Sequence, residues 1–404
     1  MLDQPAPMSL DDFSSFGIDA ERGFLPTEDP LLELPAQFAP WEEIAHDMPK
    51  LIVAGRLRHA VEGMPLLSTA AVEDERALRR AMMVLSYFGH AYVWSGGDVA
   101  GRIPENIAVP WHQVATRLSR PPVLSYASYA LDNWGRIDLN GPIEIENLTI
   151  LQNFLGGADE DWFILVHVDI EARAAQAIRA IPAALEAAAC QDADGLETQL
   201  IEIEAGLAAM ITTLRRMPDY CDPYVYFHRV RPYIHGWKDN PAVPNGVVYE
   251  GIEAYGGEAQ KFRGETGAQS GIIPAIDAAL GVAHERDKLR VYLMEMREYM
   301  PPGHRAFVHE IERQSTLRTF VHGSGVRRQS LVSAYNACLR RVEEFRYIHL
   351  EYAAKYIFRQ AENYTNSNSV GTGGTPFMPY LKKHRDETCD GLLETDGADE
   401  NELP

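Results

Sequence analysis

The stretch RQSLVSAYNACLRRVEEFRYIHLEYAAKYIFRQ, residues 328–360, decides the fold class, because it contains neither glycine nor proline. Apolar and aromatic side chains recur along it every three or four residues, which is the spacing of one face of an α-helix. The residues of this face are Leu331, Tyr335, Cys338, Val342, Phe345, His349, Tyr352 and Tyr356. We therefore expect a long buried helix that carries an imidazole, that of His349, on its apolar side.

Two earlier segments repeat the helical pattern, and patterns typical of strands are scarce. The first includes Phe163, His167, Ile170, Ala174, Ile178 and Ile181, and the second includes Leu200, Ile203, Leu207, Met210 and Leu214. Pro182 is expected to kink or end the first of these helices, since proline lacks the backbone N–H. The sequence thus predicts a mainly α protein.

Clusters of Asp, Asn and Gly between residues 132 and 160 are typical of a connector between domains. We expect a smaller α-rich N-terminal domain over residues 1–150 and a large all-helical domain over residues 151–388. The acidic residues 389–404 are expected to form a disordered tail. The first 35 or so residues, rich in turn formers and acids, are expected to wrap loosely on the surface.

The charge and the cysteines narrow the class of protein. The 404 residues include 37 Lys and Arg against 58 Asp and Glu, a formal net charge of -21, which disfavours nonspecific binding to nucleic acid or anionic membranes. The four cysteines form no CxxC pair, so a disulfide framework or structural zinc site is not expected. The N-terminus has no apolar signal segment and no run is long enough to span a bilayer, which predicts a cytoplasmic protein without membrane or nucleic-acid partners.

Several catalytic motifs are absent on inspection. Residues 371–375, GTGGT, lack the lysine of a P-loop. His167 and Asp169 have the spacing of a non-haem iron motif, but residues two apart on a helix point about 200° away from each other. Convergence of both side chains on one metal is therefore not expected.

His349 permits two interpretations. A histidine on an apolar helix face is commonly a core residue whose ring nitrogens are hydrogen-bonded to neighbours. The other possibility is an axial ligand to haem iron, with apolar side chains around the porphyrin. His167 raises the same question on another helix, and the two imidazoles could lie on opposite faces of one haem.

Seven short segments, in order, give the chain a resemblance to the indoleamine 2,3-dioxygenase family from about residue 40 to 388. The resemblance implies a haem b enzyme that uses O2, requires a reductant to keep the iron ferrous, and has its N-terminal domain over the distal side of the haem. A monomer is expected. The segments are NIAVP at 106–110, PPVLSYA at 121–127, RPYIHGWKDNP at 231–241, GVVYEG at 246–251, MPPGHR at 300–305, YIHL at 347–350 and GTGGT at 371–375.

The same resemblance implies roles for individual residues. His349 matches the proximal iron ligand, and Arg346 matches an arginine near the haem that pairs with an acid at Asp277; the alternative for Arg346 is a surface charge. Arg231 matches the arginine that binds the substrate carboxylate, for which a planar guanidinium is well suited. Further cofactor contacts are expected at Tyr129, Thr266 and Gly267. Walls of the substrate pocket are expected at Tyr126, Phe163, Tyr226, Phe227 and Ile234, and Thr372 matches a loop that closes over substrate.

The sequence departs from the family mainly in the pocket. His167 stands where the animal enzymes have serine, and it could contact the indole N–H, hydrogen-bond bound O2 or approach the iron. Tyr129 and Ala130 replace a Cys-Val pair, and Tyr226 replaces a phenylalanine. Residues 264–268 read GETGA where the family usually has GGSAG. Glu265 is thus an additional acid that lies near the haem edge or substrate amine, or else faces solvent.

The predicted function is opening of the indole C2=C3 bond of L-tryptophan by O2, giving N-formylkynurenine, the first step of the kynurenine pathway. His167 is the predicted distal catalytic residue. Two alternatives stay open at this point. One is a haem oxygenase for a modified indole in a biosynthetic route, suggested by Tyr129, Tyr226 and Glu265. The other is a haem sensor without catalysis, which would keep His349 but would not need Arg231.

Overall fold

The computed structural model describes residues 8–283, 285, 287–324, 328–362 and 377–393, and it is mainly α-helical, as predicted. The principal helices are α1 (Ala39–Val53), α2 (Leu57–Glu62), α3 (Glu75–Trp94), α4 (Glu105–Arg117), α5 (Ala158–Ala189), α6 (Ala193–Leu214), α7 (Met217–Tyr220), α8 (Pro223–Val225), α9 (Arg231–Ile234), α10 (Ile272–Leu280), α11 (Lys288–Arg297), α12 (Pro302–Gln314), α13 (Leu317–Ser324), α14 (Gln329–Ala353), α15 (Arg359–Glu362) and α16 (Phe377–Cys389).

The remaining elements are short. The strands are two residues each: β1 (Arg102–Ile103) pairs in parallel with β4 (Val248–Tyr249), and β2 (Gly135–Arg136) pairs antiparallel with β3 (Leu148–Thr149). Short 3-10 helices occur at η1 (Leu10–Phe16), η2 (Ala36–Phe38), η4 (Ile145–Asn147), η6 (Glu253–Tyr255) and η7 (Gly267–Gln269). Segments of π-helix occur at η3 (Ala127–Leu131), η5 (Tyr226–Val230) and η9 (Ala354–Phe358).

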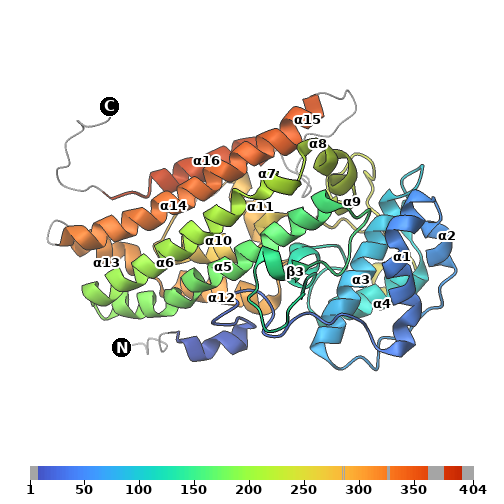
Figure 1. Ribbon diagram of the computed structural model, residues 1–404, viewed down its shortest axis with the longest axis horizontal. Helices are drawn as coiled ribbons and strands as arrows, with labels where there is room; N and C mark the ends of the chain where they lie inside the picture. Colours follow the sequence, from blue (N-terminus) through green and yellow to red (C-terminus); the bar gives the residue numbers. More distant parts are fainter. Residues whose placement is uncertain (1–7, 284, 286, 325–327, 363–376, 394–404) are drawn as a thin grey trace.

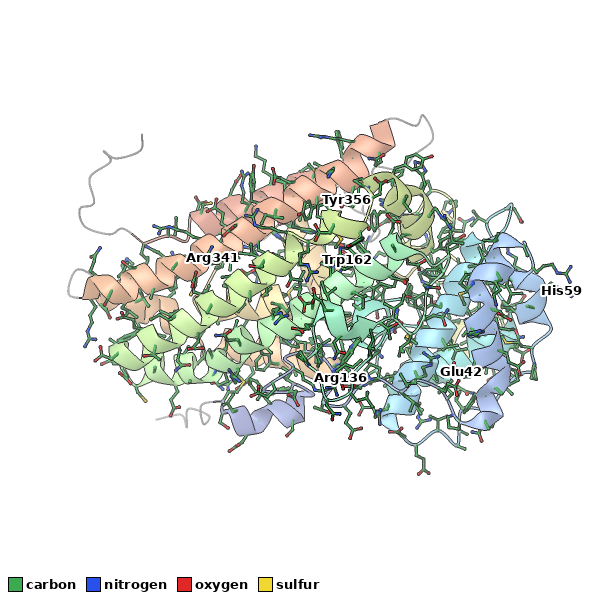
Figure 2. The ribbon with its side chains drawn as sticks, in the orientation of Figure 1. Glu42, His59, Arg136, Trp162, Arg341 and Tyr356 are labelled. Atoms are coloured by element: carbon green, nitrogen blue, oxygen red, sulfur yellow. The ribbon has the colours of Figure 1, made fainter. Side chains whose placement is uncertain are left out.

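Helices α5, α6 and α14 lie side by side and make up the longer part of the molecule (Figure 1). Helices α1 to α4 gather at one end, on the right in this view. Helix α6 packs on both α5 and α14, and α16 lies along α14. Figure 2 labels Trp162 near the start of α5 and Tyr356 just beyond the end of α14. Within the group of α1 to α4, α3 is joined to α1 by the buried ion pair of Arg80 and Glu42. The distance between Arg80 Nη2 and Glu42 Oε2 is 2.5 Å.

The start of α5 is fixed by acids. Asp159, Glu160 and Asp161 occupy its first turn, where negative charge complements the helix dipole. The Glu160 carboxylate accepts hydrogen bonds from the backbone N–H groups of residues 154, 155 and 156, at 2.6 to 3.0 Å. These bonds hold the incoming chain against the helix that carries His167.

Pro182 does not end α5, which continues through it to Ala189, so that part of the expectation is wrong. Residues 174–188 on both sides of the proline are largely buried against other helices. Packing of this kind compensates for the one helical hydrogen bond that a proline removes.

The hydrophobic side chains form two buried clusters. The first takes most of its residues from positions 25–168, and the second takes most of its residues from positions 164–356. Phe13, Ile18 and Phe24 are fully buried in the second cluster, so the expectation of a loose N-terminal wrap is wrong for this segment. The division into domains at residue 150 stays a prediction. None of the helices in the described part of the chain is long and apolar enough to cross a membrane.

Helices α5 and α6 pack closely against each other at Gly206. A Cβ atom at this position would lie 2.7 Å from the backbone nitrogen of Ala177 and 2.9 Å from its Cβ. Gly206→Ala should therefore lower the free energy of unfolding by about 1–3 kcal/mol through overpacking, although alanine favours helix more than glycine does. Chemical denaturation followed by circular dichroism measures this change.

Gly323→Ala is the matched control, because Gly323 is exposed on α13 and its added Cβ would meet no atom within 4 Å. We expect this variant to be neutral or to gain up to about 1 kcal/mol. Equal stability changes in the two variants would contradict the close packing of α5 on α6.

Candidate functional site

A cavity of about 600 Å³ lies among α5, α6, α10, α11, α14 and α16. This volume falls within the range of roughly 300–1,000 Å³ that is typical of cofactor and ligand sites. Its walls are largely apolar, with contributions from Ile170, Met210, Leu214 and Phe345. The same cavity is lined by both histidines that the helical pattern singled out, His167 and His349.

His349 presents its ring to this cavity from α14. The side chain has exposed surface, yet burial lowers the pKa of its imidazole to about 4, with a smaller contribution from His167. Part of this exposed surface forms the wall of the cavity. The ring is neutral at physiological pH, which is the form of imidazole that binds metals.

His167 approaches the cavity from α5, and its tautomer follows from one contact. Its Nδ1 lies 2.7 Å from the backbone carbonyl oxygen of Phe163. A carbonyl only accepts hydrogen bonds, so Nδ1 carries the proton. Burial lowers the pKa of His167, which keeps the ring neutral and leaves Nε2 as a hydrogen-bond acceptor.

Arg346 is buried at the cavity wall, one helical turn before His349, and is not a surface charge. Its Nη2 donates to Asp277 Oδ2 at 2.5 Å, so the expected ion pair is present and links α14 to α10. Nη1 donates to the Thr388 hydroxyl on α16. Three helices are therefore tied together by one guanidinium beside the cavity.

Glu171 is a residue of this site that the sequence analysis missed. Its Oε1 accepts hydrogen bonds from the hydroxyls of Tyr126, at 2.9 Å, and Ser270, at 2.8 Å, both of which line the cavity. The carboxyl is fully buried, and burial raises its pKa to about 7. Its position four residues after His167, on the same helix face, was the signal that could have indicated it.

An aromatic cluster, formed by Tyr126, Tyr129, Phe163 and Tyr226, adjoins the cavity at His167. The Phe163 ring lies 4.6 Å from His167, 4.7 Å from Tyr226 and 6.2 Å from Tyr129, and the Tyr126 ring lies 5.9 Å from His167. Flat rings at these separations suit an indole as a further neighbour.

Arg231 is 3% exposed and opens α9, immediately after the π-helix η5 that carries Tyr226 and Phe227. Its guanidinium carbon lies 5.2 Å from the centre of the Phe227 ring. Burial lowers the pKa of Arg231 to about 10, which still leaves it positively charged at neutral pH. A buried guanidinium next to aromatic walls is a suitable partner for the carboxylate of an aromatic ligand.

The structure brings most of the predicted site residues into one region, but only some of them line the cavity. Those that line it are Tyr126, His167, Thr266, Gly267, Arg346 and His349, whereas Tyr129, Phe163, Tyr226, Phe227, Arg231 and Ile234 lie outside its lining. Thr372 falls outside the described residues. Glu265 is 3% exposed, so the solvent-facing interpretation of this acid is wrong.

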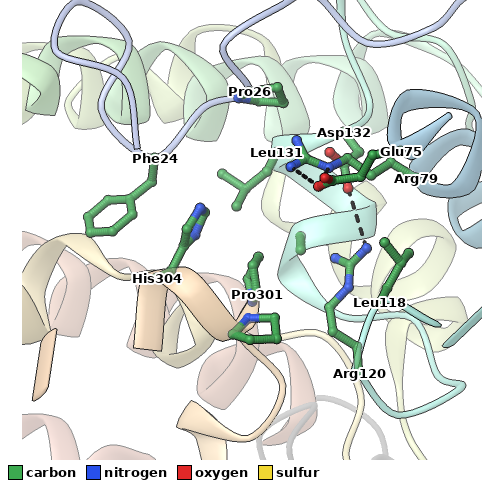
Figure 3. A pocket seen from close by; sticks show the side chains of 12 residues that line it. Phe24, Pro26, Glu75, Arg79, Leu118, Arg120, Leu131, Asp132, Pro301 and His304 are labelled. Carbon is green, nitrogen blue, oxygen red and sulfur yellow. Dashed lines mark hydrogen bonds and ion pairs between the residues drawn. The ribbon is translucent and has the colours of Figure 1, made fainter. Parts of the chain in front are cut away.

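A second cavity, of about 60 Å³, lies between η3 and the start of α12 (Figure 3). Charged side chains surround it, among them Arg120 and Asp132, whose Nη2 and Oδ2 atoms are 3.7 Å apart. His304 stands beside Phe24 on its other side, with 4.9 Å between ring centres. This space is about a tenth of the larger cavity and is too small for a tetrapyrrole.

Comparison with known proteins covers nearly the whole chain. The family model for indoleamine 2,3-dioxygenase matches residues 12–391. The chain belongs to the indoleamine 2,3-dioxygenase family. It is 38% identical to indoleamine 2,3-dioxygenase 1 of Rattus norvegicus, over 96% of this chain and 98% of that protein. It is 36% identical to indoleamine 2,3-dioxygenase 2 of Homo sapiens, over 97% of each chain.

Membership of the indoleamine 2,3-dioxygenase family makes this chain an indoleamine dioxygenase and an oxidoreductase. The family is haem-dependent and uses O2. The residues of the large cavity fit such a group, because they include a neutral imidazole on a rigid helix and largely apolar walls. The lining also contains Arg297 and Arg346, which are ion-paired with Glu312 and Asp277.

The Arg346–Asp277 pair allows a test of the cavity wall. Asp277→Asn should lower the free energy of unfolding by about 3 kcal/mol, because it leaves the buried guanidinium without its counter-charge. Asp98→Asn is the matched control: Asp98 pairs with Arg58 but is 86% exposed at its side chain, so a loss below about 1 kcal/mol is expected. Similar losses from both variants, measured by urea denaturation, would contradict the buried character of the first pair.

Proposed function

We propose that this enzyme opens the indole ring of L-tryptophan with O2 to give N-formylkynurenine, on a haem b held by His349. The observation that supports this most is the large cavity, because it is lined by two neutral imidazoles, those of His167 from α5 and His349 from α14, and adjoins the aromatic cluster at His167. The reaction would begin the kynurenine pathway, and a cellular reductant would have to keep the iron ferrous.

When bound, the ferrous haem supplies the binding and activation of O2. The contribution of the protein is to position the substrate beside it. Arg231 binds the carboxylate of tryptophan through paired N–H donors, and the aromatic cluster holds the indole flat. Fixing the two reactants in one orientation removes much of the entropy barrier of a bimolecular step.

His167 accepts the hydrogen bond of the indole N–H in this proposal. The reason is the tautomer: Nδ1–H is engaged by the Phe163 carbonyl, so the free Nε2 is an acceptor. A neutral ring in this tautomer has no proton to donate to bound O2 through Nε2. Of the three roles considered for His167, contact with the indole N–H therefore agrees best with the geometry.

A modified indole is the second candidate substrate, and one observation favours it. The Tyr129 hydroxyl is fully buried and has no hydrogen-bond partner among the described residues. It could bind a polar substituent on the ring of a substituted indole. Faster turnover of a hydroxylated tryptophan than of L-tryptophan, with the preference lost in Tyr129→Phe, would support this alternative.

Arg231→Ala should retain the haem spectrum and lower kcat/KM for L-tryptophan by about 100-fold, since it removes the charge-assisted hydrogen bonds to the carboxylate. Absorbance of N-formylkynurenine measures the turnover, and the Soret band measures the haem. Arg229→Ala is the matched control, because Arg229 is exposed two residues earlier and should leave turnover near wild type.

Haem-loaded wild-type protein that forms no N-formylkynurenine would contradict the proposed function. If Arg231→Ala turned over L-tryptophan as fast as the wild type, only the proposed binding of the substrate carboxylate by Arg231 would be contradicted.

A further inference from the structure

The smaller cavity is formed where four segments of the chain that are distant in sequence meet (Figure 3). These are the segment before α1, the start of α3, residues 118–132, and residues 301–304 at the start of α12. Phe24, Leu131 and Pro301 contribute an apolar wall, and charged side chains form the opposite wall. A concave site of this kind, with a few placed charges among apolar side chains, is suited to a small polar ligand.

The Arg120 side chain is the most deeply buried charge of this wall, with 3% of its surface exposed. Its Nη2 lies 3.7 Å from Asp132 Oδ2, which is longer than a hydrogen bond. Its Nη1 is buried and has no hydrogen-bond partner among the described residues. In Figure 3 the terminal nitrogen that is not joined to Asp132 points toward the space between Leu131 and Pro301.

A buried guanidinium with an unsatisfied N–H is energetically costly, and nearly all buried donors in folded proteins have an acceptor. The cavity in front of Arg120 Nη1 is the place from which an acceptor can reach it. The group that satisfies this donor is therefore expected inside the cavity, and a negatively charged acceptor forms the stronger hydrogen bond.

The other charges of the lining leave the space in front of Arg120 positive. Glu75 is engaged by Arg79, with 2.5 Å between Oε1 and Nη2, so this carboxylate is already neutralised. Asp132 lies on the Nη2 side of the Arg120 guanidinium. Burial lowers the pKa of His304 to about 3, and the positive charges of Arg79 and Arg120 lower it further. The field of both arginines thus extends across the cavity as far as His304.

We propose that this cavity binds one small monovalent anion, of the size of chloride or formate, through Nη1 of Arg120. The inference does not depend on the proposed function. The volume of about 60 Å³ is several times the 10–15 Å³ that one water requires, so an anion of one to three heavy atoms fits. An anion in this position satisfies the buried donor and connects four segments of the chain. It therefore stabilises the folded state in proportion to its occupancy.

Thermal unfolding of the haem-loaded protein tests the proposal in solution. Sodium gluconate, whose anion is too large for the cavity, is replaced stepwise by sodium chloride or by sodium formate at constant ionic strength. The unfolding midpoint should rise by about 1–3 °C and then level off as the site fills. The salt with the larger rise indicates whether the natural ligand is an inorganic halide or a small carboxylate.

The test variant carries Arg120→Gln together with Asp132→Asn, which removes both charges of the pair and keeps the side-chain shapes. It should lose the rise, with less than about 0.5 °C between gluconate and either test salt. The matched control carries Arg80→Gln together with Glu42→Gln. This change removes the buried ion pair between α3 and α1, whose residues do not line the cavity, and the rise should remain.

Crystals of the wild-type protein give the direct observation, and they decide the question even if the test variant does not fold. A bromide soak should place an anomalous scattering peak beside Arg120 Nη1, or a formate soak should place a three-atom density there. Water alone at this position after both soaks would overturn the proposal. So would a rise in the unfolding midpoint that the Arg120 and Asp132 variant retains in full, because the effect of the salts would then be nonspecific.

Discussion

The packing of α6 between α5 and α14 is the constraint on which the site depends. It places the first turns of α5 near the last turns of α14, so that His167 and His349 face one cavity. The contact between Gly206 and Ala177 sets the distance between α5 and α6. Because both imidazoles are carried by long helices rather than loops, their positions change only if whole helices move.

Charged groups without direct access to water surround this cavity and its aromatic neighbour. Arg346 and Asp277 neutralise each other, whereas Glu171 is held by two hydroxyls and has a raised pKa. Burying such groups is unfavourable for folding, and it is typical of sites that bind charged ligands. Arg231 is buried beside the ring of Phe227, where the substrate that we propose would bring its carboxylate.

Helical periodicity was sufficient to predict the mainly α fold and the apolar faces that carry His167 and His349. Resemblance to a family was needed for the roles of Arg231 and Arg346, because a single arginine on a helix has no distinctive pattern of its own. Glu171 was missed because a single acid on a helix usually faces solvent, and its burial depends on Tyr126 and Ser270, which are distant in sequence. Leu381 and His384 of α16 also line the cavity. The sequence does not indicate this, because it depends on how α16 packs in the folded protein.

The central claim is that His349 holds the haem iron. Resonance Raman spectroscopy of the ferrous holoprotein tests it most directly, through the stretching vibration between iron and an imidazole nitrogen. We expect this band in the wild type, its loss in His349→Ala, and its return when free imidazole is added to that variant. A band that persists unchanged in His349→Ala would contradict the claim, because another residue would then be the ligand.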